Sequence, residues 1–276
     1  MLLYLVFTVQ VLFMLGLPVA LALFLRWRWG LRWKLFWVGC LTFVGSQVVH
    51  IPLVVVEKLG LEAIGALTWP FPVLVFVDAL LLGLMAGICE EPARYLGYRF
   101  LLRKERRWRE SLMFGVGHGG IESVIAGIVV LVNVVVISWL ANTDLASLGL
   151  VGTPAEQVQQ QIDAFLVLPP YVPILGGLER LWAILLHLSL TVLVWRTLTT
   201  RRWRYFLAAI GWHWLVDTGA MLILVGTDGN VLVTEAMVAM AGLLSLGFVW
   251  WSRRWAGEEA PPGEAATFGV LEIPGL

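Results

Sequence analysis

LLYLVFTVQVLFMLGLPVALALFL, residues 2–25, contains no charged side chain. A transmembrane helix needs about 20 consecutive apolar residues to cross a hydrocarbon core of about 30 Å, so this run is long enough to span a bilayer. The N-terminal stretch MLLYLVFTVQ lacks the positively charged residues that open a secretory signal. We therefore interpret the run as the first of several membrane spans.

Further apolar runs of similar length follow along the chain. The sequence is 59% hydrophobic and 14% charged, whereas soluble domains average about 45–50% and about 25%, so lipid is the expected surroundings of the fold. The pattern predicts an all-α fold, a polytopic transmembrane helix bundle of about seven spans in one domain, 1–255, followed by a flexible tail, 256–276, rich in Pro, Gly and Glu. The predicted spans are 2–25, 35–56, 73–102, 111–141, 171–197, 205–226 and 231–251.

Lysine and arginine residues gather after the first, third, fifth and seventh runs. Cytoplasmic loops of membrane proteins carry an excess of these residues, so we expect the N-terminus outside and the C-terminus inside a prokaryotic plasma membrane. Basic clusters at span ends are a topology signal, and with a formal net charge of zero no nucleic-acid partner is expected. Cys40 and Cys89 both lie inside apolar runs and predict neither a disulfide framework nor a cysteine metal site.

Ionisable residues also occur inside four of the predicted spans. A charge at the centre of a transmembrane helix is unfavourable by roughly 2.5–3.5 kcal/mol, so each of these residues is expected to have a partner or a chemical role. Three pairs have i, i+4 spacing, which places both members on one helical face. These pairs are Glu90 with Arg94, His118 with Glu122, and His213 with Asp217.

Counting from the nearest cytoplasmic basic residue gives the depth of these groups. Four of them lie nine residues from it, and three lie thirteen residues from it. With a rise of about 1.5 Å per residue, the first set forms a layer about 13 Å deep and the second lies about 6 Å deeper. The first layer holds Arg94, His118, His187 and His213, and the second holds Glu90, Glu122 and Asp217.

Three histidines at one depth beside carboxylates favour a ligand set over three separate packing residues. Catalytic zinc takes three histidine or carboxylate ligands and keeps one position open. We therefore expect zinc or another divalent metal to be bound, and the candidate ligands are His118, Glu122, His187 and His213.

Glu90, Glu91 and Arg94 form a second candidate group, for which a structural ion pair between helices is the alternative interpretation. The side chains of adjacent helical residues point about 100° apart, so Arg94 is not expected to pair with both glutamates. One carboxylate then remains for chemistry or for another helix. We expect the site to lie in a cavity that opens toward the cytoplasm.

Three motifs occur in order on three predicted spans: EEPAR at 90–94, FGVGH at 114–118 and HWLVD at 213–217. They resemble the EE…R, FxxxH and HxxxN/D motifs of the CAAX-protease and bacteriocin-processing superfamily of intramembrane proteases. HGGIE at 118–122, ER at 179–180 and His187 are similar to the YhfC-type membrane peptidases related to that superfamily. The resemblance covers about residues 73–226.

The resemblance implies hydrolysis of a peptide bond in a membrane-associated or lipidated substrate, with Glu90 as the general base that activates water. It also implies that metal or the developing oxyanion is bound by His118, His213 and Asp217, and that Arg94 orients a carboxylate. With Glu91, these residues form the expected catalytic set. Two departures affect the assignment: the arginine usually lies one residue farther from the two glutamates, and the superfamily often has asparagine at the position of Asp217.

Two other functional classes are compatible with the same residues. Chains of Asp, Glu and His inside helices also form proton relays, so a proton-coupled transporter or channel is one alternative, although the inverted repeat of broken helices found in many transporters is not visible. A non-catalytic membrane scaffold is the other alternative. Residue spacing favours neither a particular peptide nor a particular oligomeric state.

Overall fold

The computed structural model describes residues 1–257, and this part of the chain consists of helices and turns without a β-strand. Within the same range, seven helices are long and apolar enough to cross a membrane, which confirms the predicted all-α bundle. They are α1 (Leu2–Trp29), α2 (Trp33–Ala63), α3 (Phe71–Leu96), α4 (Trp108–Leu140), α6 (Tyr171–Thr200), α7 (Arg204–Gly226) and α8 (Val231–Ser252). Residues 258–276, which make up nearly all of the predicted flexible tail, lie outside the described residues.

Shorter helices form parts of the connections. A π-helical turn, η2 (Gly97–Leu101), extends α3, and α5 (Thr153–Leu166) lies between α4 and α6. Phe165 of α5 stacks on Phe7 of α1 with ring centroids 5.4 Å apart, which holds α5 against the bundle. The remaining short helices are η1 (Ala66–Thr68), η3 (Leu145–Leu148) and η4 (Arg253–Gly257).

Helix α2 extends to Ala63, whereas its apolar pattern predicts an end at residue 56. The pattern stops because Glu57 and Lys58 are charged. In the structure Lys58 Nζ contacts Asp78 on α3 and lies 3.5 Å from Glu57 Oε2. The charges are paired between neighbouring helices, so they do not end α2.

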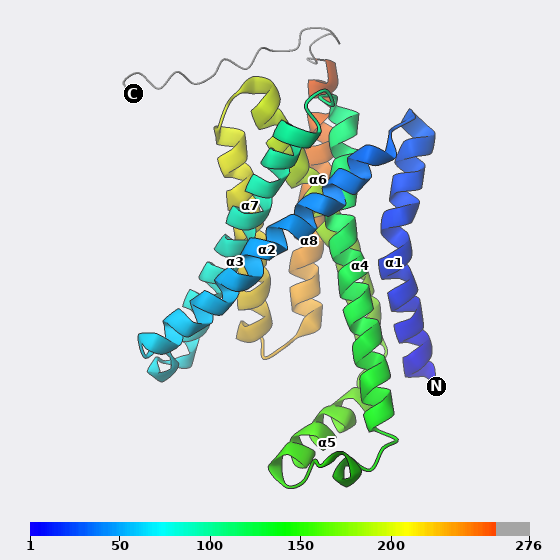
Figure 1. Ribbon diagram of the computed structural model, residues 1–276, viewed down its shortest axis with the longest axis vertical. Coiled ribbons are helices and arrows are strands. Elements are labelled where there is room, and N and C mark those ends of the chain that lie inside the picture. Colours follow the sequence, from blue (N-terminus) through cyan, green and yellow to red (C-terminus); the bar gives the residue numbers. More distant parts are fainter. Residues whose placement is uncertain (258–276) are drawn as a thin grey trace.

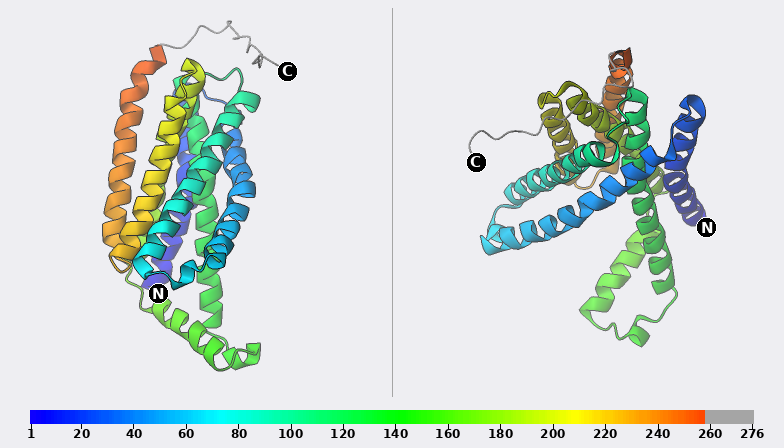
Figure 2. Two further views of the ribbon diagram at one scale, coloured as in Figure 1. Left: turned by 90° about the vertical axis from the view of Figure 1, so that its left-hand side faces the viewer. Right: turned by 45° about the horizontal axis from the view of Figure 1, so that its top comes forward.

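The spans are arranged as a ring with one helix outside it. Helices α2, α3, α7, α8, α6 and α4 contact one another in that cyclic order, and α1 packs against α4 and α6. Figure 1 shows α2 crossing in front of α4, and Figure 2 shows α5 projecting beyond one end of the bundle. The interior of this ring is where side chains from different helices meet.

The two ends of the bundle differ in charge. All Lys and Arg residues except Lys58, Arg94 and Arg180 lie in or beside the α1–α2, α3–α4 and α6–α7 connections or at the end of α8. We term this the basic end, and the opposite one, where α5 and the N-terminus lie (Figure 1), the distal end. The basic end is the one that the positive-inside rule predicts on the cytoplasmic side.

Large side chains fill the ring near the basic end. Tyr98, Met113, Phe114 and Leu190 are 0% exposed and Trp195 is 1% exposed. The rings of Tyr98 and Phe114 lie 4.7 Å apart, which is close packing for two aromatic groups. These five residues, termed the plug, close the ring on this side.

Two glycines of α4 allow neighbouring helices to approach closely. A Cβ atom at Gly117 would overlap the backbone carbonyl of Phe36 on α2, and one at Gly119 would lie 2.6 Å from Cδ2 of His187 on α6. Only a residue without a side chain fits at these contacts. The glycines therefore bring α2 and α6 against the segment of α4 that carries His118.

Candidate functional site

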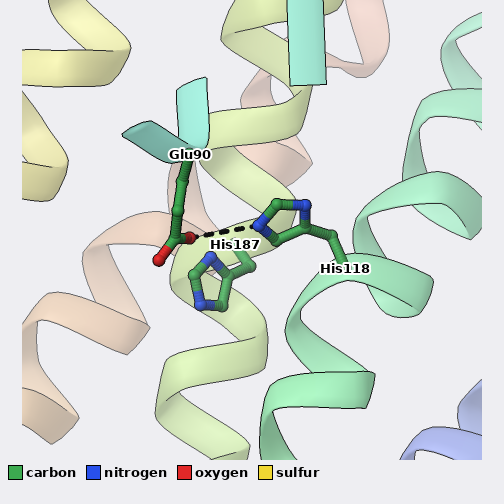
Figure 3. Close-up of side chains that lie close together, drawn as sticks. All are labelled: Glu90, His118 and His187. Atoms are coloured by element: carbon green, nitrogen blue, oxygen red, sulfur yellow. Dashed lines mark hydrogen bonds and ion pairs between the residues drawn. The ribbon is translucent and has the colours of Figure 1, made fainter. Parts of the chain in front are cut away.

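Three buried side chains from three helices converge inside the ring. Glu90 on α3, His118 on α4 and His187 on α6 each offer one ligand atom, and these atoms lie within 4.8 Å of one another. The residues are 5%, 0% and 3% exposed. In Figure 3, Glu90 Oε2 faces His118 Nε2, and the two atoms are 3.1 Å apart. We term these residues the Glu–His–His cluster.

A hydroxyl group orients the ring of His118. The Nδ1 atom lies 3.0 Å from Thr42 Oγ1, and Thr42 donates its own hydrogen to the carbonyl of Gly39 at 2.8 Å. The hydroxyl oxygen is therefore an acceptor for His118, and the neutral imidazole carries its hydrogen on Nδ1. The lone pair of Nε2 consequently points toward Glu90.

The ring of His187 is oriented from both sides. Arg94 Nη2 lies 2.5 Å from Nδ1, and because arginine only donates, Nδ1 accepts. The hydrogen of the neutral ring is then on Nε2, which donates to Glu122 Oε2 at 2.5 Å. Both histidines thus turn a lone pair toward the cluster and a hydrogen toward an outer partner, an arrangement typical of histidine metal ligands.

Arg94 is fully buried and brings positive charge to the cluster. Its Nη1 contacts Glu91 Oε1, and its Nη2 lies 3.5 Å from Glu90 Oε2. The prediction that Arg94 does not pair with both glutamates is wrong, because the two ends of the planar guanidinium fork reach two carboxylates that leave α3 in different directions. The ion pair and the candidate site are one connected group.

The third intramembrane histidine lies beside the cluster. The ring centroid of His213 is 5.6 Å from that of His187, and the rings of His187 and His118 are 5.5 Å apart, as expected for three histidines at one depth. His213 Nδ1 lies 2.9 Å from Glu91 Oε1, and Nε2 lies 3.4 Å from Asp217 Oδ2. Both ring nitrogens of His213 face carboxylates, so neither of them is one of the three converging ligand atoms.

The structure therefore separates the four residues expected as metal ligands. His118 and His187 belong to the cluster, joined there by Glu90. Glu122 orients His187 and also accepts a hydrogen bond from Arg180 Nη1 at 3.0 Å. Arg180 in turn contacts Glu179, which is its neighbour in the chain.

Thr42 is a site residue that the sequence does not reveal. A threonine in an apolar helix commonly bonds to a carbonyl one turn earlier, so its presence in the second span is unremarkable. Only the packing of His118 against α2 shows that the Thr42 hydroxyl oxygen has a second contact, with His118 Nδ1. Thr42 carries no sequence signal that distinguishes it from the other hydroxyl residues of the spans.

A cavity of about 310 Å³ adjoins the cluster. Its polar lining includes Glu90, Glu122, His187, His213 and Asp217. The cavity extends from the histidines toward the distal end, whereas the plug fills the space on the basic side. We expected the site to open toward the cytoplasm, and the residues that line the cavity lie on the side of the histidines that faces away from the basic end.

The cluster suits a divalent metal by its donor chemistry. Two imidazole nitrogens and one carboxylate oxygen are ligands that zinc takes in catalytic sites, with a further position left for water or substrate. The cavity wall includes two residues of the cluster, Glu90 and His187. Arg94 Nη2 reaches two of the same atoms, so a bound metal ion would compete with this guanidinium group.

Comparison with known proteins leads to the same site. The family model described as YhfC intramembrane metalloprotease matches residues 13–238, a range that includes the cluster and all its partners named above. The uncharacterized membrane protein YhfC of Bacillus subtilis (strain 168) is 30% identical over 247 residues, which cover 86% of this chain and 92% of that protein. No solved structure matches the chain. The extent of these two matches shows that the chain belongs to the YhfC intramembrane metalloprotease family.

Proposed function

We propose that this protein is an intramembrane metallopeptidase that hydrolyses a peptide bond in a membrane-associated or lipidated substrate. The observation that carries the proposal is the convergence of two imidazole lone pairs and a carboxylate at the buried end of a cavity. Donor groups held this close in a low-dielectric interior need a positive charge beside them. Arg94 Nη2 supplies it to Glu90 and His187 in the structure, and a bound metal ion would take over that role. The family description points to the same chemistry.

The metal, for which zinc is the best candidate, would be held by Glu90 Oε2, His118 Nε2 and His187 Nδ1. When bound, it would polarise the substrate carbonyl and lower the pKa of water. The second carboxylate oxygen of Glu90 points away from His118 in Figure 3. We assign to this oxygen the role of general base, which takes the proton of the attacking water.

His213 and Asp217 line the cavity beside the cluster. Glu91 Oε1 holds Nδ1 of His213, which leaves the Nε2 side of the ring facing Asp217 and the cavity. As an imidazolium between these two carboxylates, His213 would carry an N–H group on Nε2 as well, and this group would stabilise negative charge on the carbonyl oxygen as the peptide bond is attacked. Arg94 keeps Glu90 and Glu91 in place through its two terminal nitrogens.

Metal measurement combined with a cleavage assay tests the proposal. The protein, purified in nanodiscs, is expected to contain a divalent metal and to hydrolyse peptides from a quenched fluorescent library. His187→Ala should lower metal affinity by about 100-fold or more, whereas His50→Ala, which removes another imidazole from the cavity wall, should bind metal like the wild type. Wild-type protein without metal, together with unchanged cleavage by His187→Ala, would refute the proposal. Proton flux into liposomes without peptide cleavage would favour a transporter.

Thr42→Val is expected to reduce zinc affinity by about 10–100-fold, because it removes the acceptor for His118 Nδ1 while keeping the shape of the side chain. Thr42→Ser keeps the oxygen and should bind zinc like the wild type. Thr218→Val is a matched control, since that buried hydroxyl donates to the Ala79 carbonyl at 3.1 Å, away from the cluster. Competition with a chromogenic chelator measures the affinities. Equal affinities of Thr42→Val and wild type would contradict the assigned role of the hydroxyl.

A further inference from the structure

The cavity extends from the Glu–His–His cluster in one direction only. On α2, α4 and α7 the chain runs away from the basic end, and the lining residues come after Thr42, His118 and His213. On α3 and α6 the chain runs toward the basic end, and the lining residues come before Glu90 and His187. Helices of both directions therefore place the cavity wall on the distal side of the cluster.

The basic side of the cluster is packed without a passage in the described part of the chain. Phe114 lies one turn before His118 on α4, Ala209 one turn before His213 on α7, and both are 0% exposed. Leu190, in the turn after His187 on α6, is also 0% exposed. A peptide approaching from the basic end would have to displace these side chains, and unpacking a close-packed core is strongly unfavourable.

Helices α2 and α4 both contribute polar residues to the cavity wall. They meet where Gly39 and Gly117 lie against the backbone of the opposite helix, and they diverge from this crossing toward the distal end (Figures 1 and 2). Gln47 and His50 on α2 line the cavity and are partly exposed, as is Glu122 on α4. These polar groups of the cavity wall are therefore not fully enclosed by the bundle.

We propose that the substrate is an extended peptide segment that reaches the cluster from the distal end, along the cavity wall that carries Gln47 and His50. With the basic end in the cytoplasm, the segment that is cleaved lies in the extracytoplasmic half of the bilayer or at that surface. The identity of the substrate as a peptide rests on the proposed function. An extended backbone inside the membrane needs hydrogen-bond partners, and Gln47 and His50 offer them on this wall. A prenylated tail on the cytoplasmic side is not the expected substrate, because the plug separates that side from the cluster.

Cysteine labelling in membranes tests the direction of access without requiring catalysis or metal. The full chain, with Cys40→Ser and Cys89→Ala, receives single cysteines and is treated with a membrane-impermeant maleimide. Ala220 and Ala209 form a matched pair on α7, since Ala220 lines the cavity and Ala209 is 0% exposed on the basic side. Arg202→Cys, exposed at the basic end, reports the orientation of the membranes.

In right-side-out vesicles, Ala220→Cys and Gln47→Cys are expected to react at least about tenfold faster than Ala209→Cys, because a buried thiol reacts only through local opening. Arg202→Cys should react only in inverted vesicles. Reaction of the two cavity cysteines only in inverted vesicles, or in neither preparation, would overturn the proposed direction of access. Labelling from the outside without cleavage of any peptide would leave the direction intact and count against the proposed function.

Discussion

Glu90→Gln is expected to lower the rate of peptide hydrolysis by roughly 1,000-fold or more. The carboxylate has two proposed roles in the attack of water, because it would hold the metal and would also take the proton of the water. Glutamine has nearly the same volume, so the packing of the buried side chain is kept. Its amide cannot take a proton from water, and it binds metal more weakly than a carboxylate. Single-turnover cleavage of a peptide by protein in nanodiscs measures the loss.

Metal content separates the two roles assigned to Glu90. Glu90→Gln protein that binds zinc when zinc is saturating and still fails to cleave has lost the proton acceptor. Glu62→Gln is the matched control, because Glu62 is exposed near the distal end of α2, and its cleavage rate should equal that of the wild type. Full activity of Glu90→Gln would remove the basis of the proposed mechanism.

Arg94→Ala is expected to lower the free energy of unfolding by about 3–5 kcal/mol, because it leaves Glu91 charged and without its cation in a fully buried position. His213 Nδ1 is then the remaining partner of Glu91 among the contacts described above. Equilibrium unfolding in mixed micelles measures the difference. If the free energy of unfolding changed no more than it does when a surface ion pair is lost, the buried carboxylates would not need Arg94 for their stability.

Arg32→Ala supplies that comparison. The Arg32 side chain is 64% exposed and lies 2.7 Å from Glu105 at the basic end. Glu105 is buried, but it keeps Lys34 Nζ at 3.3 Å as a second cation, so the loss of Arg32 should change stability by at most about 1 kcal/mol. Added zinc should stabilise Arg94→Ala more than the wild type, because metal and guanidinium group compete for Glu90 and His187. Equal stabilisation of the two proteins would show that the metal binds elsewhere.

The helices of the bundle were predictable because hydropathy is a local property. Each span is recognisable by about 20 apolar residues. The predicted boundaries of α1, α4, α6, α7 and α8, and of α3 taken together with η2, lie within a few residues of those observed. The exception was the distal half of α2. Charged residues there are paired with Asp78 on α3, and a pairing between helices is not visible in either helix alone.

The histidines were also predictable as a group. Their common distance from the basic residues reflects the constant rise of the α-helix, and the ring contacts of His118, His187 and His213 agree with it. Depth, however, says nothing about rotation around each helix axis. Counting residues from the basic end therefore placed Glu90 one layer deeper than the histidines. It could not show that the Glu90 side chain points toward His118 and reaches it.

Spacing along this chain specifies a membrane bundle and the depth of its ionisable residues, because both follow from rise and hydropathy within single helices. Which nitrogen of each histidine faces the cluster depends on Thr42, Arg94 and Glu122, which come from helices other than those of the rings they orient. The direction in which the cavity opens depends on where bulky side chains of several helices pack together. Contacts between helices decide these features, so they emerge only once the helices are packed against one another.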